Sequence, residues 1–317
     1  MYQYAAAHIN PQGPGDARPT ALQIIKDGGL LGKLSDKVVL VTGANQGIGL
    51  ETARALHATG ATTWPEAKSE SPVYGIELRL GSLKSVRAAA KSFLEKSPKL
   101  NLLILNAGVM ATPEGKTEDG FDMQFGTNHL GHFLFFQLLK PALVAASTPS
   151  YQSRVISVSS MAHRMGGIRF HDFNFDKEGE YDPWLAYGQS KTANIYFTAE
   201  LERKSGAQGL HALAVHPGVI MTNLSQHVDL NQLGVTEQLK LVTKSPSQGA
   251  ATTIHAALSK EWEGRGGKCL SDCAEEPPLE PGADIMSVVP GYASWIYDEE
   301  AEHRLWEESN KLVSFRD

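Results

Sequence analysis

The chain has few cysteines, no long apolar run and no cluster of basic residues, and each absence excludes a class of protein. Its two cysteines, Cys269 and Cys273, cannot form a disulfide framework, and alone they lack the partners that a metal site requires. No apolar run reaches about 18 residues, and no basic segment leads into an apolar one, which argues against a membrane span or secretion. The net charge is −6 and the Lys and Arg residues are scattered, so the sequence shows no basic cluster that would bind nucleic acid. We therefore expect a cytoplasmic protein with no metal ion, no nucleic-acid partner and no membrane span.

What the chain does contain is an alternation of apolar, β-branched runs with amphipathic segments. This alternation predicts the α/β class, as a single doubly wound domain with a mostly parallel sheet. Residues 1–20 hold proline, glycine and small residues without periodicity, so we expect 1–35 to be a partly disordered extension and 36–317 to be the domain. Strands are expected at 38–41, 73–80, 100–105, 154–158, 210–215 and 268–270, and helices at 20–31, 48–56, 82–96, 120–146, 185–203, 246–258 and 299–312.

Tyr187 and Lys191 stand four residues apart in AYGQSKTANIY, within a segment predicted to be helical. At about 3.6 residues per turn, this spacing places a phenol and an ammonium on one face of the helix. An unperturbed tyrosine titrates at about pH 10, so it is a poor acid or base at neutral pH. A nearby cation stabilises the phenolate and lowers its pKa, as general acid–base catalysis requires. A YxxxK pattern is common by chance, and the alternative is an ordinary surface helix.

Three glycines follow a short apolar run upstream, namely Gly43, Gly47 and Gly49 in VVLVTGANQGIGLE. A strand, a glycine turn and a helix can cradle a pyrophosphate, because glycine lets the backbone approach the ligand and the helix N-terminus offers free N–H groups. By itself a glycine-rich turn is a weak signal, since glycines also serve ordinary turns. Together with the downstream Tyr187 and Lys191, it becomes a strong one.

Six short motifs occur along the chain in a fixed order. They are TGANQGIG (42–49), NAG (106–108), NHLGHF (128–133), SVSS (157–160), YGQSK (187–191) and HPGVIMT (216–222). In this order they resemble the short-chain dehydrogenase/reductase family, from about residue 36 to the end of the chain. The nearer likeness is to its retinol-dehydrogenase and WW-domain-oxidoreductase branch, fungal members above all, which carries a longer insert before the tyrosine.

The resemblance implies a Rossmann-type fold and an NAD(P)-dependent oxidoreductase. Such an enzyme interconverts a carbonyl and an alcohol on a small apolar substrate by hydride transfer. NADP is the expected cofactor and NAD is the alternative. The apolar stripe HFLFFQLLKPAL is expected in the core or in a homodimer contact, because relatives pair the helix at 120–146 and the Tyr/Lys helix across a two-fold axis.

The resemblance also assigns roles to individual residues. Tyr187 would be the acid/base, Lys191 would lower its pKa and bind the nicotinamide ribose, and Ser160 would hold the reacting oxygen. Ser159 stays open as the alternative to Ser160, because a shift of one residue along a strand reverses side-chain direction. Asn128 would bind backbone and a water beyond Lys191. The implied catalytic set is Asn128, Ser160, Tyr187 and Lys191, and the implied cofactor contacts are Gly43, Gly47, Ile48, Gly49, Asn106, Ala107, Gly108, Asn128, Tyr187, Lys191, Pro217, Gly218, Ile220 and Thr222.

One part of the expected fold is short. Between Gly60 and Val73 only ATTWPEAKSESP remains for a second strand and a crossover helix, whereas a crossover alone needs about 10–12 residues. Pro65 and Pro72 interrupt ladders and helices as well, so we predict that this strand and its helix are shortened or missing. Arg79 stands where the family carries an acidic residue that meets the adenine, and a 2′-phosphate is its alternative partner. The alternative function is therefore a non-catalytic binding protein of the same fold with an impaired cofactor site.

Overall fold

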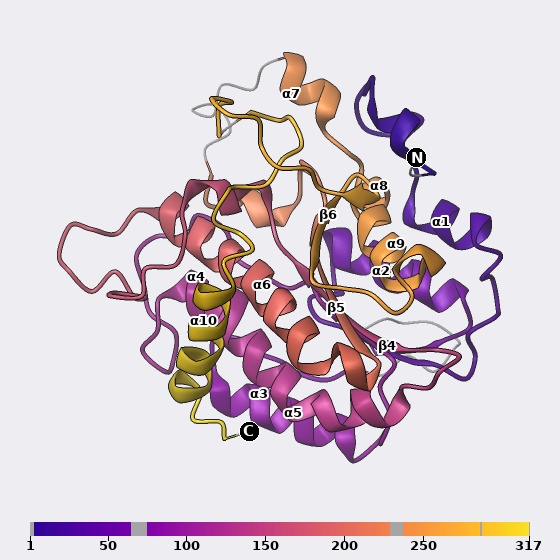
Figure 1. Ribbon diagram of the computed structural model, residues 1–317, viewed down its shortest axis with the longest axis horizontal. Coiled ribbons are helices and arrows are strands. Elements are labelled where there is room, and N and C mark those ends of the chain that lie inside the picture. The colour runs from indigo at the N-terminus through magenta and orange to yellow at the C-terminus, as the bar shows by residue number, and fades with distance from the viewer. Residues whose placement is uncertain (1–2, 65–74, 229–236, 286, 317) are drawn as a thin grey trace.

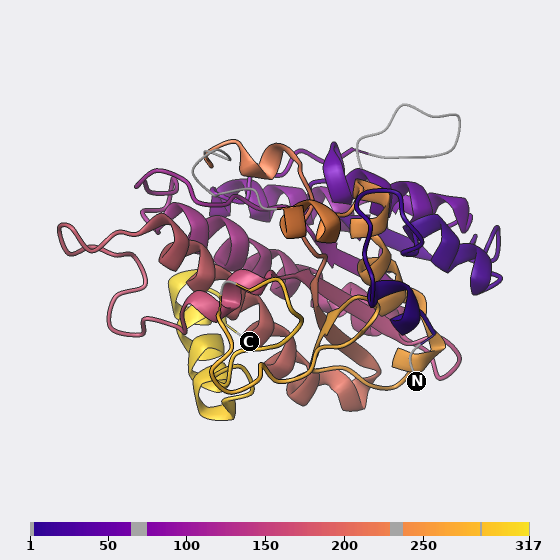
Figure 2. The same ribbon diagram turned by 90° about the horizontal axis from the view of Figure 1, so that it is seen from above.

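A seven-stranded sheet runs through the centre of the part of the chain that the structure describes (Figures 1 and 2). The computed structural model describes residues 3–64, 75–228, 237–285 and 287–316. The strand order is β2-β1-β3-β4-β5-β6-β7, and every neighbouring pair is parallel except β6 and β7. The chain passes from β1 to β2 and then returns to the other side of β1, so the predicted doubly wound α/β fold is confirmed. The strands are β1 Val38–Val41, β2 Thr62–Trp64, β3 Leu102–Leu105, β4 Ser153–Val158, β5 Leu210–His216, β6 Lys268–Ser271 and β7 Ala274–Glu275.

Helices cover both faces of the sheet (Figure 2). On one face α1, α2, α8 and α9 pack together, and on the other α3, α5 and α6 do so, with α10 lying against α6. None of the described helices combines the length and the apolar content needed to cross a membrane. The helices are α1 Ala21–Asp27, α2 Gly47–Ala58, α3 Leu83–Leu94, α4 Met123–Phe125, α5 Gly131–Ala146, α6 Pro183–Ser205, α7 Glu237–Val242, α8 Pro246–Gly249, α9 Ala251–Leu258 and α10 Glu299–Leu312.

Successive residues of each central strand enter different halves of the core. Leu40 and Leu103 pack with the helices α3, α5 and α6, whereas Val39 and Ile104 pack with α1, α2 and α9. This alternation follows from the pleat, which points neighbouring side chains to opposite faces. Because both faces are covered, β1 and β3 are apolar at every position, as is typical of the buried strands of parallel sheets.

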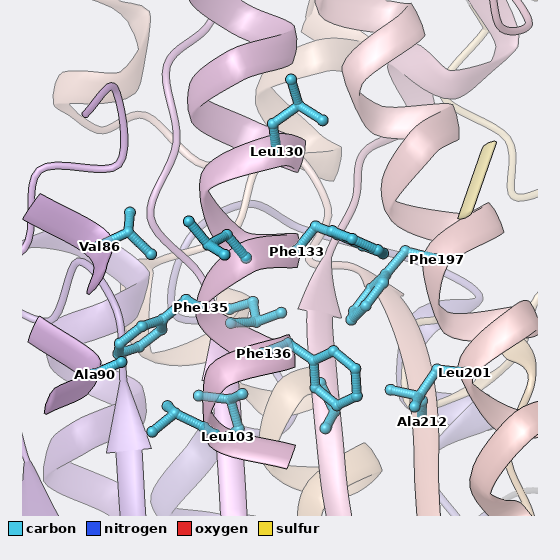
Figure 3. Packing of buried hydrophobic residues seen from close by; sticks show 14 of the residues in the cluster. Val86, Ala90, Leu103, Leu130, Phe133, Phe135, Phe136, Phe197, Leu201 and Ala212 are labelled. Carbon is cyan, nitrogen blue, oxygen red and sulfur yellow. The ribbon is translucent and has the colours of Figure 1, made fainter. Parts of the chain in front are cut away.

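The apolar stripe of α5 lies in the core of the chain itself. Figure 3 shows Phe135 directed toward Ala90 of α3, and Phe133 and Phe136 directed toward Phe197 of α6. All three phenylalanines of α5 are buried, and the ring centres of Phe136 and Phe197 are 5.2 Å apart. Of the two expectations for this stripe, core packing is therefore the one observed.

Helix α10 covers the outer side of α5 and α6 (Figure 1). The Trp306 indole stacks on Phe197 with ring centres 6.0 Å apart and meets Phe133 edge-on at 5.1 Å. The Oγ of Ser309 lies 2.8 Å from Nε2 of the buried His129. A homodimer contact through α5 and α6 would therefore require α10 to leave its place.

The region around β2 agrees in part with the predicted truncation. β2 is present but spans three residues, each paired with β1. The described residues 75–82 hold neither strand nor helix before α3 begins. The strand predicted at 73–80 is therefore wrong for residues 75–80, and 73 and 74 lie outside the described residues. A strand there would need a neighbour to share its ladder, and the backbone N–H of Arg79 bonds instead to Ser85 Oγ at 3.0 Å.

Residues 3–20, for which we expected poor order, make specific contacts. Arg18 is buried and donates to the carbonyl oxygens of Gly13, Val242 and Thr243. Such contacts leave no periodic signature in the sequence, because carbonyl oxygens are supplied by any residue. The helix predicted at 20–31 is confirmed over residues 21–27 as α1 and is wrong for 28–31, and the domain boundary at residue 35 stays a prediction.

Candidate active site

Tyr187 and Lys191 lie one turn apart on α6. Asp182 caps this helix by accepting two backbone N–H bonds at 2.8 and 2.9 Å, and Pro183 occupies the first turn, where its missing N–H costs nothing. Tyr187 is 3% exposed and Lys191 is 4% exposed. The Lys191 Nζ lies 5.4 Å from the centre of the Tyr187 ring. The predicted pairing of a phenol and an ammonium on one helix face is therefore present.

The acidity of Tyr187 differs from the expectation. Burial raises the pKa of Tyr187 to about 12, and the hydrogen bond with Ser160 acts in the opposite direction. Lys191 is directed elsewhere, since its ammonium donates to the carbonyl oxygen of Val158 at 3.0 Å, and burial lowers the pKa of Lys191 to about 8. The expected lowering of the Tyr187 pKa by Lys191 is therefore wrong for this structure. At neutral pH the Tyr187 side chain is a neutral phenol that can donate a proton.

The end of β4 separates the two serines that the sequence left open. Ser159 is buried, and its Oγ donates to the backbone carbonyl of Lys191 at 2.8 Å. Ser160 is half-buried, hydrogen-bonds with Tyr187 and caps the short 3-10 helix Met161–Met165. Adjacent residues in extended backbone point to opposite sides. Of the two serines, Ser160 is the one that the structure brings to the tyrosine.

Asn128 sits in a π-helical turn, Gly126–Leu130, between α4 and α5. Such turns re-aim side chains within a helix and are frequent at functional sites. The side-chain Oδ1 accepts from the Val109 N–H at 2.8 Å, and Nδ2 donates to the Val109 carbonyl at 2.9 Å. A Cβ placed on Gly108 would lie 3.0 Å from Asn128 Oδ1 and 3.6 Å from Lys191 Nζ. Asn128 therefore binds backbone, as expected, and lies beside Lys191.

The glycine turn is a close-packed cradle that only glycine permits. Gly43 has a φ of +66°, and a Cβ there would lie 2.8 Å from Ala107 Cα. A Cβ on Gly49 would lie 2.2 Å from the Gly43 carbonyl oxygen and 2.4 Å from Asn106 Nδ2. α2 begins at Gly47, and no side chain caps its first turn. Uncapped N–H groups at a helix N-terminus suit a phosphate, so these residues fit a dinucleotide cofactor.

The segment after β5 closes over this turn. A Cβ on Gly47 would lie 3.3 Å from Thr222 Cγ2. A Cβ on Gly249 would lie 2.7 Å from Ile220 and 3.3 Å from Ile48. Ile220 and Thr222 thus adjoin the glycine turn from the other side, at the carboxyl edge of the sheet where doubly wound folds bind ligands.

Two supporting residues were missed from the sequence. Thr42 Oγ1 accepts the backbone N–H groups of Asn106 and Ala107, both at 3.0 Å, and so joins the end of β1 to the end of β3. Its place as the first residue of TGANQGIG was the available signal. Lys244 donates from Nζ to Asp272 at 2.6 Å and to the Pro217 carbonyl at 3.3 Å, and no motif indicated it.

Comparison with known proteins agrees with this arrangement. Residues 37–233 match the family model of the short chain dehydrogenases. The short-chain dehydrogenase/reductase prx1 of Penicillium roqueforti is 46% identical over 98% of this chain and 95% of its own length. Retinol dehydrogenase 12 of Mus musculus is 43% identical over 76% of this chain and 79% of its own length. Among solved structures, that of an uncharacterised protein from Mycobacterium Paratuberculosis is similar, with a TM-score of 0.67 and 34% identity over 91% of this chain and 97% of that one.

Proposed function

The chain belongs to the short-chain dehydrogenase/reductase family of oxidoreductases, and from this premise we propose that it interconverts a carbonyl and an alcohol on a small apolar substrate. The single observation that carries the proposal is the convergence of Tyr187, Lys191, Ser160 and Asn128 from three separate segments, namely α6, the end of β4 and the π-helical turn before α5. An ordinary surface helix would leave its tyrosine and lysine exposed, and these are buried together.

Tyr187 is the proposed acid/base. In reduction its hydroxyl gives a proton to the carbonyl oxygen, and in oxidation the phenolate takes one from the alcohol. A pKa of about 12 suits the donating role, because the oxygen that receives the proton in reduction becomes an alkoxide, a stronger base. The Ser160 hydroxyl, which already bonds to Tyr187, holds the same substrate oxygen.

The residues around the glycine turn are the proposed cofactor site. Gly43, Gly47 and Gly49 with the N–H of Ile48 receive the pyrophosphate, and Lys191 binds the nicotinamide ribose. The other proposed contacts lie at the ends of β3 and β5, namely Asn106, Ala107, Gly108, Pro217, Gly218, Ile220 and Thr222. The nicotinamide, when bound, supplies or accepts the hydride, and the protein supplies the orientation and the proton. We propose NADP rather than NAD from the resemblance to the retinol-dehydrogenase branch.

The cellular location, the type of substrate and the oligomeric state belong to the same proposal. We propose a cytoplasmic enzyme that acts on a small molecule. We do not propose a homodimer through α5 and α6, because Trp306 and its neighbours on α10 cover that face.

Cofactor titration and one substitution test the function. NADPH and NADH are titrated separately, and nicotinamide fluorescence reports binding. Turnover is then measured with NADPH and a panel of apolar ketones. Tyr187→Phe should lower kcat by about 10²–10⁴-fold and leave the Kd of NADPH within about threefold, because it removes only the transferable proton.

Tyr196→Phe is the matched control. Tyr196 lies on the same helix, and its hydroxyl donates to the Trp295 carbonyl at 2.8 Å, away from Ser160 and Lys191. Its loss should leave kcat within about threefold of the wild-type value. Full turnover in Tyr187→Phe would exclude the tyrosine mechanism.

A second candidate function rests on the length of β2 and on the contacts of Arg79. If neither cofactor shows saturable binding at millimolar concentration, the chain is a binding protein that has kept the fold. The three-residue β2 and the ion pair of Arg79 with Glu118 favour this alternative, since both lie where the adenosine end of the cofactor is expected.

A further inference from the structure

A cavity of about 440 Å³ lies beside the proposed site, over the carboxyl ends of β4, β5 and β6. Its floor includes Met161, which follows Ser160, and Gly218 and Val219 from the segment expected to meet the nicotinamide. Cavities that bind small molecules usually measure about 300–1,000 Å³. The position and size of this cavity therefore suit the body of a substrate whose reacting oxygen lies at Tyr187.

Three walls of the cavity come from segments far apart in the sequence, namely residues 8–12, α7 and residues 288–290. All three lie outside the part of the chain that matches the family model. Each wall carries a large apolar side chain that is exposed at the cavity, Ile9 at 72%, Leu241 at 42% and Val289 at 54%. Apolar groups gathered at an opening are typical of a site for apolar ligands.

The N-terminal wall is fastened to α7 through Arg18. Its guanidinium donates to the carbonyl oxygens of Val242 and Thr243 at 2.7 Å, and to that of Gly13 at 3.1 Å. The Gly13 N–H in turn donates to the Leu241 carbonyl at 2.8 Å. Because Arg18 is buried, leaving these carbonyls unpaired would carry a large desolvation cost. The first two walls therefore form one unit.

His8 fastens the same wall to the floor. Its Nδ1 lies 3.1 Å from Asp272 Oδ1, which also accepts from Lys244 Nζ at 2.6 Å. Burial alone would raise the pKa of Asp272, but the hydrogen bonds and charges of His8 and Lys244 hold it well below its usual range. Since Lys244 also donates to the Pro217 carbonyl, this cluster joins the N-terminal wall to the segment of Gly218.

The third wall is fastened by Arg164, three residues after Met161. Its guanidinium donates to the carbonyl oxygens of Ser287 at 3.0 Å, Val289 at 2.8 Å and Gly291 at 2.6 Å. Arg164 is itself fully buried. Its hydrogen bonds therefore hold the loop 287–291 close to Met161 and to Ser160, the residue before it. Buried side chains therefore hold both the wall from the N-terminal residues 8–12 and the wall from the C-terminal residues 288–290.

We propose that this cavity holds the body of the substrate, and that residues 8–12 set the largest body that it accepts. The ligand class is a ketone or secondary alcohol with a bulky body that presents apolar groups to Ile9, Leu241 and Val289. The inference rests on the proposed function for the reacting group and adds the size selection. That selection belongs to segments that flank the family core, whereas the chemistry belongs to the core itself.

Two substitutions fill the cavity from opposite walls. Gln12→Trp and Val289→Trp each add a large side chain, and both keep the backbone bonds of the wall, from Gln12 N to Asp16 and from Arg164 to the Val289 carbonyl. Leu31→Trp is the control, at an exposed position that does not line the cavity. With NADPH, KM for a decalone should rise about tenfold in both wall variants, while KM for cyclohexanone and the Kd of NADPH change by less than about twofold. The control should match the wild type with both ketones.

The failure of this inference is distinguishable from failure of the proposed function. Equal changes of KM for the two ketones, or no change for either, would overturn the cavity assignment while leaving the chemistry intact. If the wild type reduces neither ketone, the cavity is tested directly by titration with the apolar fluorophore anilinonaphthalenesulfonate. A Kd about tenfold weaker in both wall variants than in the wild type and Leu31→Trp supports the site. Equal affinity in all four proteins refutes it.

Discussion

The two ends of the sheet differ in how firmly they hold their parts of the proposed site. At the chemistry end, β4 pairs over its six residues with β5, and α5, α6 and α10 cover it. At the nucleotide end, β2 pairs over three residues with β1 and ends the described sheet. A short edge strand has one row of hydrogen bonds and little to bury, so it contributes less stability.

This difference places the proposed catalytic residues and the proposed cofactor contacts on separate parts of the fold. Tyr187 and Lys191 lie on α6, and Asn128 lies in the turn that leads into α5, and buried aromatic packing holds these two helices together. The glycine turn is likewise fixed, because Gly49 fits against Gly43 with no room for a methyl group. The short element at the nucleotide end is β2, which spans three residues. The proposed chemistry therefore does not depend on the contacts that we expect at the far end of the cofactor.

The largest expected effect is a loss of stability in acid that originates mostly at the chemistry end. Burial lowers the pKa values of His129 and His216 to about 3 and those of His132, His163 and His255 to about 4. In the unfolded chain these imidazoles take up protons below about pH 6.5, so unfolding binds protons between that pH and about 4. Stability is thus complete above pH 6.5 and falls as the pH drops, by up to about 7 kcal/mol per pH unit for the five groups together. Urea unfolding at several pH values measures this slope.

Substitution of one histidine locates the source of that slope. His129→Gln should reduce it by about one fifth, since one of five such groups is gone. His303→Gln, at an exposed side chain on α10, should leave it unchanged. An identical slope in both variants would contradict the assignment to the buried imidazoles.

The next effect compares packing at the two ends. Trp306→Ala removes the ring that contacts Phe133 and Phe197, and it should lower the free energy of unfolding by about 3–5 kcal/mol. Thr63→Ala, at a buried position on β2, removes one hydroxyl that donates to the Ala61 carbonyl and should cost about 1 kcal/mol. Chemical denaturation of both variants measures the difference. Similar losses at the two positions would show that β2 is held as firmly as α10.

The smallest effect concerns Arg79 and the choice of cofactor. Its guanidinium is paired with Glu118, which also accepts from Ser82 Oγ, and its side chain is largely exposed. Because these carboxylate contacts occupy it, Arg79→Gln should change the ratio of the NADPH and NADH dissociation constants by less than about threefold. Titration of both cofactors tests this. A tenfold increase of the dissociation constant that is confined to NADPH would instead indicate that Arg79 binds the 2′-phosphate of this cofactor.

Much of the fold could be predicted from local patterns. β1 has the predicted bounds 38–41 and α10 the predicted bounds 299–312, because an apolar β-branched run and an amphipathic repeat with an Asp298 cap are local signals. The strand predicted at 73–80 was wrong for 75–80, because the same apolar alternation forms a strand only where a neighbour supplies the ladder. The contacts of Arg18 and Lys244 were invisible, since their partners are backbone carbonyls and a single carboxylate from distant segments.

The sequence by itself determined which residues could do the chemistry, because the spacing of Tyr187 and Lys191 on a helix and the glycines after β1 are local properties of the chain. Only the tertiary structure decided between Ser159 and Ser160, since that choice depends on which way the end of β4 faces α6. It also decided the acidity of Tyr187, because burial is set by everything that packs around the ring rather than by the lysine one turn away. The cavity beside the site belongs to the same class of facts, since residues 8–12 and 288–290 meet only when the whole chain has folded.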